Sequence, residues 1–198
     1  MAKQTKGVSR NSTVRRPAPK LQPQQTQQDS QMMNSMMEKL FLDQLKDIYY
    51  VEKTQVKALG KMAKKATTEE LRDILLEHQE VSQEQLSRLD QIFDILGKRA
   101  QAKRCPVMDG LQEEAEDMMS ETEDDTLTRD VALIITAQKV EHYEIASYGC
   151  LATLARTYGM QEVADLLQET LEEEKDADLQ LTYIAENNIN FEVGQEQE

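Results

Sequence analysis

Two glutamates occupy positions where the helical pattern of the sequence calls for apolar side chains. Residues three and four apart share one face of a helix, and stretches 41–62 and 163–184 each carry such a stripe of mostly apolar residues. Glu52 interrupts the first stripe, while Thr170 and Glu174 interrupt the second. A carboxylate is rarely buried unless it is paired or bound to a metal, because removing it from water alone is costly. We therefore expect each glutamate to have a partner inside the fold.

Two further helical stretches carry polar groups on their inward stripes. His78 lies near the middle of the second stretch, and Glu141 lies near the middle of the third, with Glu144 one turn further on. Asp178 follows Glu174 by one turn, and a modest rotation of that helix would also turn Glu173 inward. The candidate metal ligands are therefore Glu52, His78, Glu141, Glu144, Glu173, Glu174 and Asp178.

Together these groups favour a site for iron or manganese. Antiparallel helices of similar length bring their midpoints together, so the polar groups should meet in one layer. Carboxylates alone would repel one another there, whereas divalent cations neutralise them. A carboxylate-rich set with one imidazole suits iron or manganese better than zinc, which prefers sulfur and nitrogen ligands. We expect about one or two ions per chain, and we assign no catalytic residue.

Four long helices are predicted to position these groups. The pattern predicts them at about 35–65, 67–96, 127–158 and 161–187, with a capping box over 67–70 and helix-ending glycines at Gly97 and Gly159. Residues 98–126 form a long crossover, in which 108–119 can form a short helix. No segment alternates with period two, so we expect no strand. Two hairpins joined by one long crossover are typical of an all-α, ferritin-like antiparallel four-helix bundle.

Composition divides the chain into three parts. Residues 1–34, rich in Gln, Pro, Ser and Lys, are expected to be a disordered arm, 35–187 the bundle, and 188–198 a flexible tail. The first 28 residues carry six basic side chains and no acidic one, so the net charge of −14 is +6 in this segment and −20 in the remainder. Nucleic acid could therefore bind only through the arm.

The expected compartment is the cytoplasm. No stretch approaches the roughly 20 apolar residues that a membrane span needs, and the N-terminal segment lacks the apolar run of a secretory signal. We therefore expect no membrane contact. Cys105 and Cys150 have neither the spacing of a zinc pair nor the density of a disulfide scaffold, so we expect two reduced thiols.

Five stretches carry a recognisable set of motifs. They are DIYYVEKTQ at 47–55, RLDQIF at 88–93, CPVMDGL at 105–111, VEHYEIASYG at 140–149 and LLQETLEEEK at 166–175. Over about residues 38–187 they resemble the YciE/YciF-like family of bacterial stress-associated proteins, which belongs to the ferritin-like superfamily. The resemblance implies a four-helix bundle, a homodimer, a two-metal centre with the ligands named above, and a role in the stress response.

One residue departs from the pattern of this family. Where the family shows an acid three residues after His78, this chain has Val81, so one metal site could be weak or absent. The Glu-x-x-His motifs of ferritins and rubrerythrins are also missing in that form, so the resemblance does not by itself imply ferroxidase activity.

The sequence leaves functions of different classes open. The first is a metal-binding stress protein that holds iron or manganese and could oxidise Fe(II) or detoxify oxidants. The second is a structural or interaction protein, a helical dimer whose degenerate polar layer only fixes the register of the helices. In a third, the basic arm condenses DNA.

Overall fold

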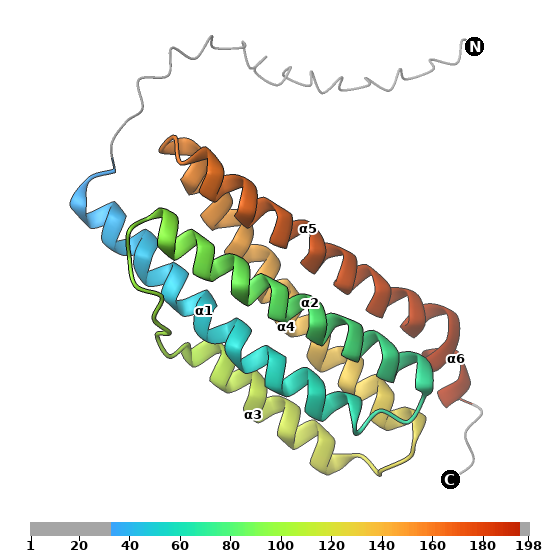
Figure 1. The fold of residues 1–198 in the computed structure, drawn as a ribbon. Helices are drawn as coiled ribbons and strands as arrows, with labels where there is room; N and C mark the ends of the chain where they lie inside the picture. The colour runs from blue at the N-terminus through green and yellow to red at the C-terminus, as the bar shows by residue number, and fades with distance from the viewer. Residues whose placement is uncertain (1–32, 195–198) are drawn as a thin grey trace, which may run out of the picture.

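The computed structural model describes residues 33–194, in which helices are joined by turns and loops and no strand occurs (Figure 1). Most of the arm expected at residues 1–34 lies outside the described residues. The helices are α1 (Ser35–Ala63), α2 (Glu69–Ile95), α3 (Pro106–Glu121), α4 (Leu127–Thr157) and α5 (Gln161–Ile184), followed by the π-helical turn η1 (Ala185–Ile189) and the short α6 (Asn190–Val193).

Two antiparallel hairpins build the bundle. Helices α1 and α2 form one hairpin, α4 and α5 form the other, and the two pack side by side (Figure 1). Helix α3 runs along the outside of the bundle, in contact with α4 and α1. The crossover thereby returns the chain to the end of the bundle at which α2 begins, which is the ferritin-like connectivity that the sequence predicted.

Short-range signals set the ends of the long helices. The side chain of Asn34 accepts a hydrogen bond from the Met37 amide at the start of α1. Gly97 and Gly159 follow α2 and α4 with φ of 62° and 73°, a conformation that glycine adopts without steric cost. The predicted capping box over 67–70 does not form: Thr68 caps α2, and the residue three positions later is Leu71.

A buried aspartate ties the two turns at one end of the bundle together. Asp130, which is 0% exposed, accepts hydrogen bonds from the amides of Thr67 (2.7 Å) and Thr68 (2.9 Å). The hydroxyl of Thr67 donates to the carbonyl of Thr126 (2.8 Å), so Thr67 bridges to the α3–α4 turn instead of capping its own helix. The α1–α2 turn is thus fixed against the start of α4.

The buried apolar side chains form two clusters, one in each half of the bundle. The first includes Phe41, Leu89, Tyr148 and Leu167, and the second includes Leu59, Leu75, Leu133 and Leu181. Between them, each of the four bundle helices contributes buried polar side chains. The core therefore has a polar layer across its middle, where the interrupted stripes predicted one.

The C-terminal segment differs from the expectation of a flexible tail from residue 188. The chain remains helical to Val193, because Ile189 is only 1% exposed and packs into the second apolar cluster. Residues 195–198 lie outside the described range. The apolar period continues through a π-helical turn, which a search for the spacing of an α-helix misses.

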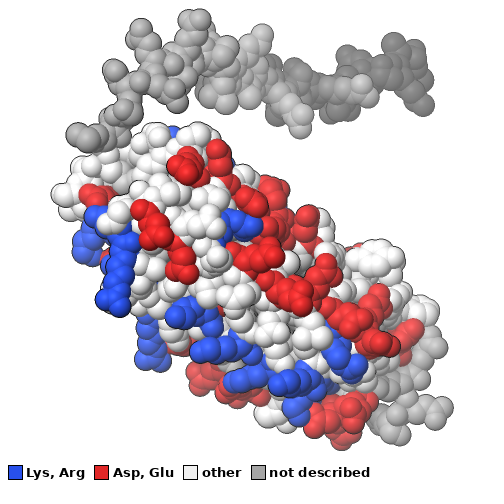
Figure 2. Space-filling model, viewed as in Figure 1, with Lys and Arg blue, Asp and Glu red and all other residues white. Residues whose placement is uncertain are grey.

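Charge is divided between the faces of the bundle. Figure 2 shows basic side chains along α1 and acidic side chains over α2 and α5.

No helix within residues 33–194 has the length and apolar character needed to cross a membrane. Cys105 and Cys150 are both free, as predicted.

Candidate metal centre

Five predicted ligands from the four bundle helices meet in the polar layer. Glu52 comes from α1, His78 from α2, Glu141 and Glu144 from α4, and Glu174 from α5. The four glutamates are 0% exposed and the histidine is 7% exposed. Each lies near the middle of its helix, so the antiparallel packing brings them to the same level of the bundle.

The five side chains form two groups of three that share one residue. The first group is His78, Glu141 and Glu174, and the second is Glu52, Glu144 and Glu174. Within each group, one potential ligand atom from each residue lies within 4.8 Å of the others. Ligand atoms at about 2.0–2.2 Å from a common ion are at most about 4.4 Å apart, so each group has nearly the spacing of one ion's ligands.

His78 lies between the carboxylates of two other helices. Its Nδ1 is 3.3 Å from Oε1 of Glu141, and its Nε2 is 3.6 Å from Oε2 of Glu174. The amide of Gln55 donates a long hydrogen bond of 3.5 Å to the same oxygen of Glu141. The imidazole therefore faces both carboxylates of its group at distances that leave the contacts loose.

A buried tyrosine supports the second group. The hydroxyl of Tyr148, which is 0% exposed, donates a hydrogen bond to Oε1 of Glu52. Tyr148 follows Glu144 by one turn and therefore shares its face of α4. That spacing was the available signal for a contact with the polar layer, although it could not name the acceptor.

Most polar atoms of the centre lack a protein partner. Among the described residues, nine buried side-chain nitrogen or oxygen atoms have no hydrogen-bond partner. Seven belong to the two groups: Glu52 Oε2, His78 Nε2, Glu141 Oε2, both carboxylate oxygens of Glu144 and both of Glu174. Buried polar atoms are normally satisfied, so such a concentration at one place makes this cluster a candidate ligand site.

The carboxylates also have strongly perturbed acidities. Burial, together with the nearby carboxylate of Glu174, raises the pKa of Glu52, Glu141 and Glu144 well above the usual range. The hydrogen bond from Tyr148 opposes part of this rise in the pKa of Glu52. Without a cation, the chain favours protonated carboxylic acids here, whereas a bound cation would favour the carboxylates.

The structure brings Glu173 into neither group. Its oxygens accept hydrogen bonds from Arg88 at 2.8 and 2.9 Å, and one of them also accepts from Gln85 at 3.1 Å. Arg88 also donates to the hydroxyl of Thr170 (2.8 Å), the other interruption of the α5 stripe. Sequence reasoning did not identify Arg88, although it follows Gln85 by one turn and thus shares a face with it.

Asp178 likewise lies outside both groups. One of its oxygens is 3.3 Å from the amide nitrogen of Gln138 and 3.4 Å from Nε2 of His142, whose side chain is 69% exposed. Val81, the departure from the family pattern, lies one turn from His78, and both residues line a pocket between α2 and α5. Neither residue supplies an atom to the two groups, and a ligand role for Asp178 stays a prediction.

Comparisons with known proteins place the chain in a family. The family model described as "Domain of unknown function (DUF892)" matches residues 36–194. Protein YciF of Escherichia coli K12 is 44% identical over 155 residues, which are 78% of this chain and 93% of that protein.

Two solved structures share both fold and sequence with the chain. The crystal structure of YciF, described as a stress protein of E. coli, has a TM-score of 0.74 at 44% identity and covers 80% of this chain and 99% of its own. YcfI of Rhodopseudomonas palustris, to which a structural role has been ascribed, has a TM-score of 0.72 at 41% identity, with coverage of 79% and 97%. The chain therefore belongs to the DUF892 family and is a homologue of the stress protein YciF.

Proposed function

We propose that this chain is a metal-binding stress protein whose polar layer holds two divalent cations of iron or manganese. The observation that carries the proposal is that two groups of buried ligands share Glu174, and neither oxygen of Glu174 has a hydrogen-bond partner. A carboxylate has two oxygens, so Glu174 would contribute to both sites. The first ion would be held by His78, Glu141 and Glu174, and the second by Glu52, Glu144 and Glu174.

Charge balance supports two ions. The four buried glutamates carry four negative charges when ionised, and two divalent cations neutralise them. Arg88, the buried cation on the α2 face of the layer, is already paired with Glu173 and Glu169. With fewer ions, some buried carboxylates would have to remain protonated, as the raised pKa values of Glu52, Glu141 and Glu144 indicate for the metal-free chain.

The donor set supports iron or manganese. Four carboxylates and one imidazole form an oxygen-rich site without sulfur, which suits these ions better than zinc. Iron in such a site would supply redox chemistry with oxygen or peroxide, because anionic oxygen ligands favour the more highly charged ion. The chain's own residues would bind the ions, keep the four glutamates buried, and fix Glu52 through Tyr148.

The test is the amount of metal retained by purified, full-length protein. The protein is freed of metal with a chelator, incubated anaerobically with Fe(II) or Mn(II), separated from unbound ions by gel filtration, and analysed for its elements. We expect about two ions per chain for the wild type, since each group of ligands holds one. Glu144→Gln should retain about one, because only the second group loses a ligand.

A shared ligand gives a distinct signature. Glu174→Gln should lose both ions, whereas Glu172→Gln, two residues earlier with a side chain that is 58% exposed, should retain both. Exposure of the iron-loaded protein to air, followed by its absorption spectrum, then tests oxidation of Fe(II). A wild-type chain that retains no metal, or a Glu174→Gln chain that retains as much as the wild type, would contradict the proposal. The chain would then be a structural protein, the role ascribed to the R. palustris relative.

The remaining expectations about partners and place belong to the same proposal. We propose that the chain is cytoplasmic and forms a homodimer. Light scattering of the purified chain tests the dimer through its mass. The basic segment 1–28 lies outside the described residues, and its proposed contact with DNA predicts retardation that weakens with salt. Deletion of that segment should abolish the retardation without changing the metal content.

A further inference from the structure

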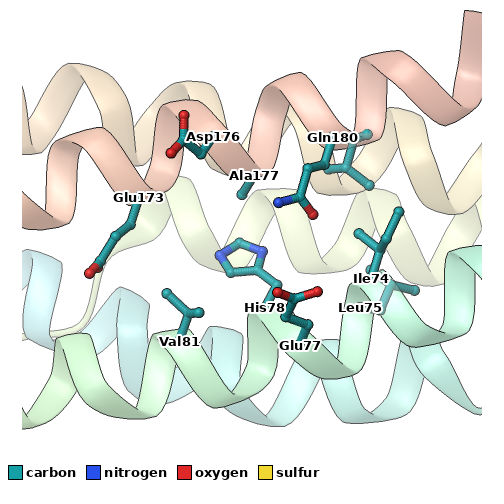
Figure 3. A pocket seen from close by; sticks show the side chains of 10 residues that line it. Ile74, Leu75, Glu77, His78, Val81, Glu173, Asp176, Ala177 and Gln180 are labelled. Atoms are coloured by element: carbon teal, nitrogen blue, oxygen red, sulfur yellow. The ribbon is translucent and has the colours of Figure 1, made fainter.

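A pocket between α2 and α5 leads from the surface to the candidate metal centre. It has a volume of about 180 Å³, and His78 is among its lining residues. Figure 3 shows the imidazole of His78 between the two helices, with Ala177 of α5 above it and Val81 of α2 beside it. The pocket therefore reaches one of the five proposed ligands directly.

Short side chains create this opening. Packed helices lie about 8–10 Å apart, a distance that long side chains normally fill. Here α5 contributes Ala177 and α2 contributes Val81 to the pocket, and both are only partly buried. The valine that departs from the family's acidic residue thus lines a passage and supplies no ligand atom.

The inner end of the pocket carries an unsatisfied ligand atom. His78 is 7% exposed, and its Nε2 has no hydrogen-bond partner. The same nitrogen is 3.6 Å from Oε2 of Glu174, the residue shared by both groups of ligands. An ion that reaches the imidazole is therefore one short step from both proposed sites.

The outer end of the pocket is acidic. Glu77 of α2 and Asp176 of α5 line it and are exposed, and the residues that line it include no lysine or arginine. Acidic side chains gather over this face of the bundle in Figure 2. Carboxylates at the mouth of a low-dielectric passage raise the local concentration of cations.

A second pocket near the centre is too small for the same role. It lies on the side covered by α3, has a volume of about 30 Å³, and is lined in part by Glu141 and Ala115. The α2–α5 pocket is about six times as large. Of these two pockets, the α2–α5 pocket has more room for a cation with part of its hydration shell.

We propose that the α2–α5 pocket is the route by which a divalent cation reaches the centre, with His78 as the first ligand that it meets. This inference rests on the proposed function, because the route matters only if the centre binds metal. It adds the path, the first ligand and the role of the acidic mouth, and it assigns the narrow pocket under α3 no part in uptake.

The first test needs no metal. Diethyl pyrocarbonate modifies accessible neutral imidazoles, and this chain has only two histidines, His78 and the exposed His142. In metal-free protein, peptide mass spectrometry should show both histidines modified. Ala177→Leu fills the pocket and should reduce modification of His78 about tenfold, to a level set by local opening, while His142 reacts as before. Ala115→Leu, the matched change in the other pocket, should leave both reactions unchanged.

The second test measures metal uptake. Binding of Co(II) is followed by stopped-flow absorption in the full-length wild type, Ala177→Leu and Ala115→Leu. We expect Ala177→Leu to slow association about tenfold or more with the final number of bound ions unchanged, and Ala115→Leu to bind at the wild-type rate. Wild-type uptake in Ala177→Leu, or slow uptake in Ala115→Leu, would overturn the route.

A third variant keeps the route testable if leucine at position 177 disturbs folding. Glu77→Gln combined with Asp176→Asn removes the charges of the mouth without filling the pocket. At low salt it should slow association about threefold, and the difference should disappear at high salt, where such attraction is screened. An unchanged rate at low salt would count against the acidic mouth. A wild type that binds no metal defeats the proposed function, whereas normal binding with no effect at position 177 defeats the route alone.

Discussion

Glu144, like Glu174, is costly to bury in the metal-free centre. It is 0% exposed, and neither of its carboxylate oxygens has a hydrogen-bond partner. Glu52, by contrast, accepts a hydrogen bond from Tyr148. Replacement of buried ionisable groups by apolar side chains of similar volume often stabilises a protein. Glu144 should therefore reduce stability in the metal-free chain and contribute to it only when an ion is bound.

Glu144→Leu should raise the free energy of unfolding of chelator-treated protein by about 1–4 kcal/mol, because it removes a buried group without a partner. The same variant should lose most of the stabilisation that Mn(II) gives the wild type. Urea denaturation with and without Mn(II) measures both effects. Glu116→Leu, on the exposed surface of α3, is the control and should change stability by no more than about 0.5 kcal/mol. Destabilisation of the metal-free chain by Glu144→Leu would contradict this account.

The sequence identified the polar layer better than it separated neighbouring acids. Interrupted apolar stripes located Glu52 and Glu174, because burial of one helix face is a periodic and local signal. The choice between Glu173 and Glu174 depends on the rotation of α5 and on Arg88, which comes from a different helix. A contact between helices of this kind has no signature in the spacing of a single helix.

Among the helices, Asp130 fixes the position of one hairpin relative to the other. It lies at the start of α4 and satisfies two amides of the α1–α2 turn, so it connects the hairpin that carries Glu52 and His78 to the hairpin that carries the other ligands. An aspartate near the first turn of a helix is also favoured by the helix dipole. The alignment of the four midpoints therefore depends in part on this residue.

Asp130→Ala should lower the free energy of unfolding by about 1–3 kcal/mol, because the amides of Thr67 and Thr68 would lose their acceptors. Urea denaturation of the metal-free protein measures the change. Glu123→Ala, in the exposed α3–α4 turn, serves as the control and should alter stability by less than about 0.5 kcal/mol. An Asp130→Ala chain as stable as the control would show that the turn is held by other contacts.

Most of the helices could be predicted because their signals are local. The four long helices begin and end within a few residues of the predicted positions, since apolar periods, caps and glycines act over one or two turns. The role of Asp130 could not be predicted, because its partners are more than sixty residues earlier in the chain. The helical segment after residue 187 was missed because the helix changes from an α to a π period there, so the buried Ile189 falls outside the α-helical spacing.

The stability of the protein depends on pH through two sets of carboxyl groups that act in opposite directions. Burial raises the pKa of Glu52, Glu141 and Glu144, whereas a lysine or arginine neighbour helps to lower the pKa of Asp43, Asp124 and Glu172 at the surface. A carboxyl whose pKa is raised by folding makes the folded protein less stable as the pH rises above the usual glutamic acid pKa of about 4.3. A carboxyl whose pKa is lowered acts in the opposite sense, and exposed groups contribute little.

A comparison of two variants isolates the buried contribution. The difference in stability between metal-free Glu144→Leu and the wild type should be small near about pH 4 and should widen toward about pH 7.5, because only the wild type must keep Glu144 protonated or bury its charge. Thermal denaturation across this range measures the difference. With Mn(II) present the trend should reverse, since metal binding releases protons and strengthens as the pH rises. A gap that narrows with rising pH in the metal-free protein would contradict the assigned direction.

The division of the apolar core into two clusters has a consequence for cooperativity. Each half of the bundle has its own set of buried apolar side chains, and the polar layer lies between them. Without ions, the halves are joined by groups that repel one another or must hold protons, so each end can open with little effect on the other. Ions shared among all four helices would couple the halves into a single unfolding unit. Hydrogen exchange would then show amides at both ends of the bundle slowing together as metal is added.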